Sequence, residues 1–154
     1  MKIYLARHGE AVPMEIDPEC PLSERGKQKL QRLVDYLRPQ GVLVSHVYHS
    51  GKLRAQQTAE ILATVMAPGQ DIAVMRGLSP NDPVGPVAED ISGWSDDTLL
   101  VGHLPFMAHL VGELMARDPY ALFVDFQPGT LVCLQRTNGG LWHIDWVLRP
   151  DELS

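Results

Sequence analysis

Three apolar runs along the chain have the length and composition of buried β-strands. They cover residues 2–6, 42–49 and 98–101, and polar, proline or glycine residues bound each of them. Continuous apolar runs of this length are typical of strands that are covered on both faces, as in a parallel sheet. A shorter run at residues 72–75 predicts one more strand of the same kind.

Between these runs, apolar residues recur every three or four positions, which is the period of a helix with one buried face. Ser23 has the side chain of a good N-cap, and we expect it to begin a helix that ends before Gly41. A second helix is predicted over residues 52–66, and a third begins at Pro105, which suits a first helical turn. Residues 77–94 are rich in Pro, Gly, Asn and Asp, and they predict a long, partly helical loop of a kind that is often functional.

The end of the chain has the pattern of a hairpin. Residues 129–135 and 141–147 predict two strands, and the Asn-Gly-Gly sequence at 138–140 predicts the turn between them. The earlier alternation of strands and helices predicts a parallel sheet with helices on both faces. We therefore expect a three-layer α/β/α sandwich with a mostly parallel central sheet and a C-terminal antiparallel hairpin, formed by residues 1–154 as one domain.

Composition and charge narrow the classes of partner. The chain has 13 Lys and Arg against 19 Asp and Glu, a formal net charge of -6, so a general binder of nucleic acid or anionic membranes is not expected. No apolar run approaches the length of a membrane span. The two cysteines, Cys20 and Cys133, have neither metal-binding nor redox spacing. Unpaired thiols in a domain of this size indicate a cytoplasmic protein.

Polar residues follow two of the predicted buried strands directly. Arg7, His8 and Gly9 come after the first strand, and Gly102 and His103 come after another. In open α/β sheets, ligands bind beyond the carboxyl ends of the strands, so these side chains should share one crevice. A neutral imidazole, with its ordinary pKa of about 6.5, is a nucleophile at physiological pH, and covalent catalysis by His is an established route for group transfer.

A third cluster lies where a strand gives way to the second helix. The hydroxyl of Ser50 and the free N–H groups of the first helical turn can meet an anion there. Arg54 is unfavourable for the helix dipole so close to a helix start, unless a bound anion uses its charge. A surface turn, a solvated arginine or a structural histidine would explain any one of these residues. Two arginines and two histidines at one edge favour an anion site.

Four segments, in this order, resemble the histidine phosphatase superfamily, which is also called phosphoglycerate-mutase-like. The short length and the forms of the first and last segments are most similar to the SixA-type phosphohistidine phosphatases. The segments are ARHGEA near the N-terminus, PLSERG at 21–26, HSGKLRAQQTAE at 49–60 and VGHLP at 101–105.

The resemblance implies a phosphatase whose nucleophile, His8, takes up the phosphoryl group. It implies that Arg7, Arg54 and His103 bind that group, and that these four residues are the catalytic and phosphate-binding set. It also places Gly9 behind the nucleophile, where we expect a glycine to allow close approach to the ligand. Because Arg and His can neutralise the phosphoryl charge, we expect neither a metal nor another cofactor.

The mutases of this superfamily carry an acidic residue that acts as a general acid, and no such residue can be assigned in this chain. The loop before the second histidine offers Asp82 and Glu89, but neither falls in an alignable motif. An alkoxide leaving group needs a proton, whereas the imidazole of a phosphohistidine can leave as a neutral base. We therefore expect a phosphohistidine in a protein to be the substrate. A phosphatase for small metabolites and a binding module without turnover are the alternatives, and the oligomeric state is left open.

Overall fold

The computed structural model describes residues 1–153, which form six strands, four α-helices and two short 3₁₀ turns. The strands are β1 (Lys2–Arg7), β2 (His46–His49), β3 (Ile72–Val74), β4 (Thr98–Gly102), β5 (Leu131–Arg136) and β6 (Trp142–Leu148). The helices are α1 (Glu24–Leu37), α2 (Leu53–Met66), α3 (Gly85–Ser92) and α4 (Phe106–Ala116), with 3₁₀ turns at Arg38–Gln40 and Pro150–Glu152. None of the helices in residues 1–153 is long and apolar enough to cross a membrane.

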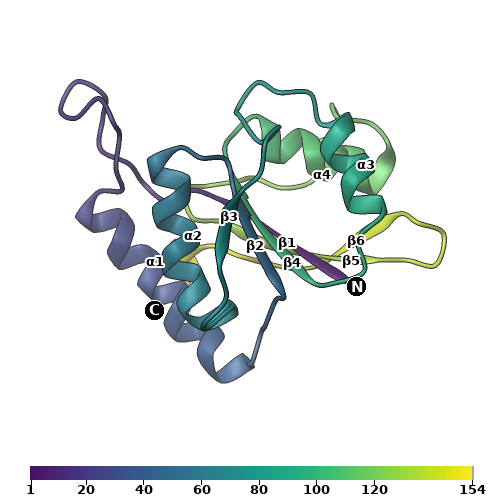
Figure 1. Cartoon of the computed structure of the whole chain (residues 1–154), viewed down its shortest axis with the longest axis horizontal. Coiled ribbons are helices and arrows are strands. Elements are labelled where there is room, and N and C mark those ends of the chain that lie inside the picture. The colour runs from purple at the N-terminus through teal and green to yellow at the C-terminus, as the bar shows by residue number, and fades with distance from the viewer. Residues whose placement is uncertain (154) are drawn as a thin grey trace.

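All six strands belong to one mixed sheet in the order β3-β2-β4-β1-β5-β6. The four strands β1 to β4 are parallel to their neighbours among themselves, whereas β5 runs antiparallel to β1, and β6 antiparallel to β5. Figure 1 shows α1 and α2 on one face of this sheet and α3 and α4 on the other. The predicted three-layer sandwich with a C-terminal hairpin is therefore confirmed.

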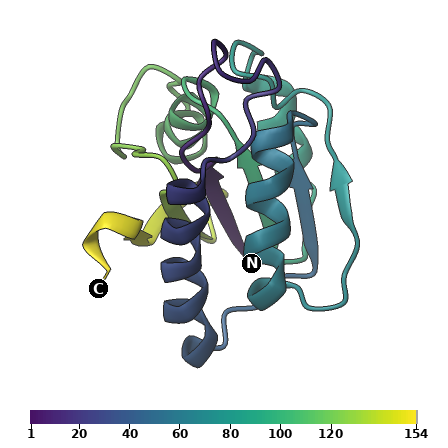
Figure 2. The same ribbon diagram turned by 90° about the vertical axis from the view of Figure 1, so that its left-hand side faces the viewer.

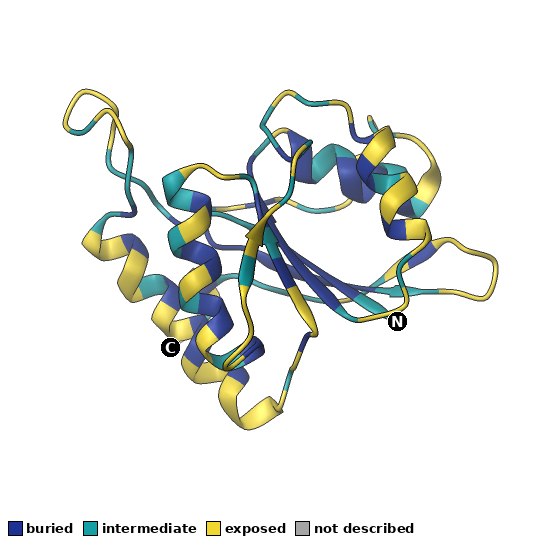
Figure 3. Ribbon diagram, in the orientation of Figure 1, coloured by how far each residue is buried: buried dark blue, intermediate teal, exposed yellow. Residues whose placement is uncertain are grey.

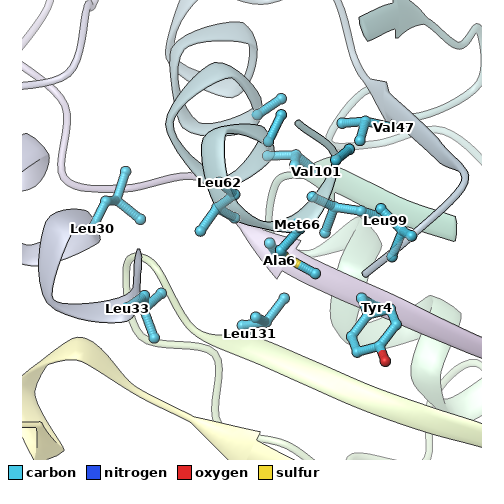
Figure 4. Packing of buried hydrophobic residues seen from close by; sticks show 14 of the residues in the cluster. Tyr4, Ala6, Leu30, Leu33, Val47, Leu62, Met66, Leu99, Val101 and Leu131 are labelled. Atoms are coloured by element: carbon cyan, nitrogen blue, oxygen red, sulfur yellow. The ribbon is translucent and has the colours of Figure 1, made fainter. Parts of the chain in front are cut away.

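Each face of the sheet has its own hydrophobic core. Side chains of α1 and α2, among them Leu30 and Leu62, pack on Ala6 and Val101 from one side (Figure 4). Phe106 of α4 belongs to the cluster on the other side, which also includes residues of α3. The central strands β4, β1 and β5 are mostly buried (Figure 3), and complete burial of one aliphatic or aromatic side chain contributes about 1.5–3 kcal/mol.

The predicted second strand begins later than expected. Residues 42–45 were expected to continue it, but the strand starts at His46, which pairs with Thr98, the first residue of β4. The two residues before it use their backbone N–H groups elsewhere: Val44 donates to the carbonyl of Met66, and Ser45 donates to that of Asp97. Because β4 begins at the residue that pairs with His46, residues 42–45 have no strand partner in β4. The apolar run therefore does not extend β2.

The predicted start of α1 is confirmed. The hydroxyl of Ser23 accepts a hydrogen bond from the backbone N–H of Gly26 at 3.0 Å, so Ser23 is the N-cap. Gly26 lets this helix approach the loop after β1, because a Cβ at this position would overlap the carbonyl oxygen of Glu10. The loop, which projects at the upper left of Figure 1, is therefore held at the start of α1.

Candidate active site

Strand register brings His8 and His103 together. Arg7 at the end of β1 pairs with Gly102 at the end of the parallel strand β4, and each is followed directly by one of the histidines. The backbone N–H of His8 donates to the carbonyl of Gly102 at 3.0 Å. The two imidazole rings lie with their centroids 5.0 Å apart. The carboxyl ends of two adjacent parallel strands thus bring both rings to the same end of the sheet, as the sequence predicts.

The next strand and helix complete this edge of the sheet. His49, the last residue of β2, pairs with Val101, so Ser50 follows beside the end of β4. The Ser50 hydroxyl lies 2.6 Å from Nε2 of His103. α2 begins three residues later and carries Arg54 in its first turn, where the guanidinium charge is close enough to lower the pKa of both histidines. Figure 2 shows that the loop after β1 and the segment after β3 rise at this same end of the sheet.

One ring nitrogen of His8 is fixed by the backbone. Nδ1 lies 2.7 Å from the carbonyl oxygen of Gly9, and because a carbonyl only accepts, Nδ1 carries the hydrogen. In the neutral ring Nε2 then holds the lone pair. Burial is the main cause that lowers the pKa of His8 to about 4; the Gly9 carbonyl opposes the shift, and the charges of Arg54 and Arg7 add to it. At neutral pH the side chain is therefore an uncharged imidazole with a defined basic nitrogen.

His103 is deeply buried, with 1% of its surface exposed. Burial lowers its pKa to about 3, and the charges of His8, Arg54, Lys52 and Arg7 act in the same direction. Its Nδ1 atom is buried and has no hydrogen-bond partner. A bound anion would relieve this positive field, because its charge has the opposite sign.

The guanidinium group of Arg7 is held by a backbone carbonyl of the segment before β5. Its Nη1 donates to the carbonyl of Phe126 at 2.8 Å, while its Nε is buried without a partner. Burial lowers the pKa of Arg7, and the nearby Asp125 carboxylate opposes that shift. Arginine stays charged despite such a shift, so the guanidinium presents a positive charge held by the backbone of residue 126.

Thr58 is a supporting residue that the sequence analysis did not single out. It is fully buried, and its hydroxyl accepts a hydrogen bond from the backbone N–H of Gly9 at 3.0 Å. The same hydroxyl donates to the carbonyl of Arg54 at 2.8 Å. It therefore connects the peptide behind His8 to the helical turn that carries Arg54. The spacing of four residues between Arg54 and Thr58 was a usable signal, since it places them one helical turn apart. Lys52, whose charge also reaches His103, was likewise missed.

The structure gives a further reason for a glycine at position 9, besides the expected close approach to a ligand. A Cβ at Gly9 would lie 3.0 Å from Cδ1 of Leu30 and 3.3 Å from Cδ2 of Leu22. Close packing against α1 and against Leu22 therefore also favours a glycine here.

The two acidic residues considered as proton donors have other surroundings. The Asp82 carboxylate accepts a hydrogen bond from the backbone N–H of Ser79 at 2.9 Å and closes a turn in the segment between β3 and α3. Glu89 lies on the exposed face of α3. Neither takes part in the hydrogen bonds of His8 and His103 described above. Over the 153 residues described, no group of three or more His, Cys, Asp or Glu side chains is arranged to hold a metal ion.

Comparison with known proteins agrees with this geometry. The profile of the histidine phosphatase superfamily (branch 1) matches residues 3–79. Phosphohistidine phosphatase SixA of Escherichia coli (strain K12) is 25% identical over 159 residues, which span 100% of this chain and 97% of that protein. An uncharacterized protein of Picosynechococcus sp. is 31% identical over 112 residues, 68% of this chain and 67% of that protein. A solved structure of the protein histidine phosphatase SixA complexed with tungstate has a TM-score of 0.86 at 26% identity, with 100% of both chains covered. This chain belongs to the histidine phosphatase superfamily.

Proposed function

We propose that the chain is a phosphatase that removes the phosphoryl group from phosphohistidine in a protein, through a phosphorylated His8. The observation that carries the proposal is the state of His8: a neutral ring whose Nδ1 hydrogen is held by Gly9, which leaves the Nε2 lone pair to attack phosphorus. Arg7, Arg54 and His103 would bind the phosphoryl oxygens and offset their charge. The proposal needs no metal or other cofactor.

The first step exchanges one imidazole for another. The Nε2–P bond to His8 forms as the N–P bond of the substrate breaks, and the substrate imidazole keeps the electron pair of the broken bond. If the substrate ring carries a hydrogen on its other nitrogen, it leaves neutral, and phospho-His8 becomes the cationic ring. No proton has to move. The Nδ1–H to Gly9 hydrogen bond stabilises that cationic ring.

The second step is hydrolysis of phospho-His8. Water forms the new O–P bond, the His8 N–P bond breaks, and both hydrogens of the water leave with the phosphate. His8 returns to its neutral form with Nδ1 still protonated. This balance supports a P–N substrate, because neither Asp82 nor Glu89 has to donate a proton to the leaving group. An alkyl phosphate would leave as an alkoxide, for which a general acid contributes roughly 10²–10⁴-fold.

The similarity to SixA, which is named a phosphohistidine phosphatase, supports the same substrate class. A phosphatase for sugar phosphates or nucleotides remains the alternative within the superfamily. A binding module without turnover is the alternative outside catalysis. The free Nε2 lone pair of His8 favours a catalyst over such a module, since a site built only to bind an anion would gain from a hydrogen-bond donor there.

Trapping the intermediate tests the proposal. The protein is mixed with a protein carrying ³²P-phosphohistidine and quenched in alkali, which preserves N–P bonds. We expect transient label on the wild type and none on His8→Ala, with label retained by His143→Ala, which removes an exposed histidine of β6. Turnover by His8→Ala at the wild-type rate would contradict the mechanism. Equal kcat/KM on phosphohistidine and an alkyl phosphate would contradict the substrate class.

A further inference from the structure

A pocket of about 400 Å³ lies next to the candidate active site. It opens between the segment that follows β3, helix α4 and the loop after α4. Pro105 contributes to its wall and comes two residues after His103, so the pocket adjoins the phosphate-binding end of the sheet. Its lining also includes His109 and Glu113 of α4, together with Asp82 and Tyr120.

The lining of this pocket is acidic, in contrast to the active site. Asp82 and Glu113 are both among its lining residues, and no lysine or arginine is. The Oε2 atom of Glu113 is buried and has no hydrogen-bond partner. A carboxylate with one oxygen buried and unpaired is unfavourable, so a cation that enters the pocket would offset the charge of Glu113.

Two further side chains of the pocket also favour a hydrogen-bond donor or a cation. Nδ1 of His109 lies 2.6 Å from the carbonyl of Pro119 and therefore carries the hydrogen, which makes Nε2 of the neutral ring an acceptor. Tyr120 packs edge-on against His109, with ring centroids 5.6 Å apart, and yet 80% of Tyr120 is exposed. A large aromatic ring presented beside carboxylates is a favourable surface for a cation.

We propose that this pocket receives a basic side chain, arginine or lysine, that flanks the phosphohistidine of the substrate protein. The inference rests on the proposed function, since it assigns the surroundings of the same substrate. Arg7, Arg54 and Lys52 repel a basic segment at the phosphoryl site, whereas Glu113 attracts it two turns along α4. The positive charges of the active site and the negative charge of the pocket together orient the substrate. Its phosphoryl group lies at His8, and its basic residue lies in the pocket.

Matched peptides test this assignment. A set of phosphohistidine peptides carries one arginine at each of the three positions on either side of the histidine, and a second set carries citrulline, the neutral isostere, in its place. For at least one position we expect the wild type to prefer arginine about tenfold in kcat/KM, through KM, which corresponds to one well-formed charged contact. Glu113→Gln should abolish most of that preference, while its hydrolysis of phosphoimidazole, which is too small to reach the pocket, stays unchanged.

Two other variants keep the test specific. Glu60→Gln removes the same charge from the exposed face of α2, on the opposite side of the sheet, and should leave the preference intact. Tyr120→Ala alters an exposed side chain, and so tests the pocket even if Glu113→Gln fails to fold; we expect a partial loss of the preference. Equal rates for arginine and citrulline at every position, or a preference that survives both pocket variants, would overturn the assignment.

A binding measurement separates this inference from the proposed function. The His8→Ala protein is titrated with the unphosphorylated arginine and citrulline peptides and followed by NMR. Shifts at residues 109–120 with the arginine peptide alone would support the pocket even if no phosphohistidine peptide were hydrolysed, which would count against the proposed function only. An absence of such shifts would overturn the pocket, and hydrolysis of the peptides would still support the proposed function.

Discussion

The hydroxyl of Ser50 and Nε2 of His103 lie 2.6 Å apart, although 53 residues separate them in the chain. Their meeting is a product of the parallel pairing of β2 with β4, which sets His49 beside Val101. The contact holds the ring of His103, whose other nitrogen has no partner. The orientation of a buried imidazole in the candidate phosphate site thus depends on one serine at the start of the loop before α2.

Replacing Ser50 should therefore weaken catalysis without unfolding the protein. A neutral hydrogen bond is worth about 0.5–1.5 kcal/mol, so Ser50→Ala should lower kcat on phosphoimidazole by roughly two- to tenfold. Steady-state kinetics measure the effect, and Ser95→Ala, which changes an exposed serine shortly before the start of β4, at the opposite end of that strand from His103, serves as the control. An unchanged kcat in Ser50→Ala would show that the serine does not position His103.

Thr58 should be important for both stability and activity. Thr58→Val keeps the shape of the side chain but leaves the buried N–H of Gly9 without an acceptor, at a cost of about 1–3 kcal/mol. The peptide behind His8 and the turn carrying Arg54 also lose their connection, so kcat should fall as well. Denaturant unfolding and kinetics test both effects. Thr58→Ser retains the hydroxyl and should recover most of the activity; equal loss in both variants would assign the effect to the missing methyl group.

The two histidines should make the protein less stable in mild acid. Their pKa values in the folded protein, about 4 for His8 and about 3 for His103, lie below the ordinary value of about 6.5. The unfolded chain then binds protons first, so stability is full above pH 6.5 and declines as the pH falls toward 4. We expect His8 to account for on the order of 2 kcal/mol of this decline.

Unfolding free energies measured between pH 7 and pH 4.5 test this effect. The carboxylates contribute to the same curve, so the informative quantity is the difference between the wild type and His8→Ala. The variant should lose less stability over this range. Parallel curves would mean that the ring of His8 titrates near its ordinary pKa in the folded protein.

Gly26 should tolerate no side chain. In Gly26→Ala the new Cβ overlaps the backbone carbonyl of Glu10, which has no rotamer to move aside, so α1 or the loop after β1 must move. Overpacking of this kind costs typically about 1–3 kcal/mol. Thermal or denaturant unfolding measures it. Gly85→Ala is the matched control, because a Cβ there meets nothing within 4 Å. Equal stability of the two variants would contradict the close approach.

Much of the fold could be read from the sequence because its signals are local. Apolar runs and helical periodicity identified every strand of the parallel core, and Ser23 marked the start of α1. The segment before His46 was assigned wrongly for the same reason: its composition suits a strand, but strand length depends on where the partner β4 begins.

The same difference between local signals and long-range contacts holds for the candidate site. The sequence alone was enough to predict the residues proposed to carry the chemistry, since His8, Arg7, Arg54 and His103 lie in short motifs at predicted element ends. Only the tertiary structure decided that Thr58 supports Gly9, that Gly9 packs closely against Leu30, and that an acidic pocket adjoins a basic site. Motifs and periodicity are properties of neighbouring residues, whereas strand register and helix packing join residues that are far apart in the chain.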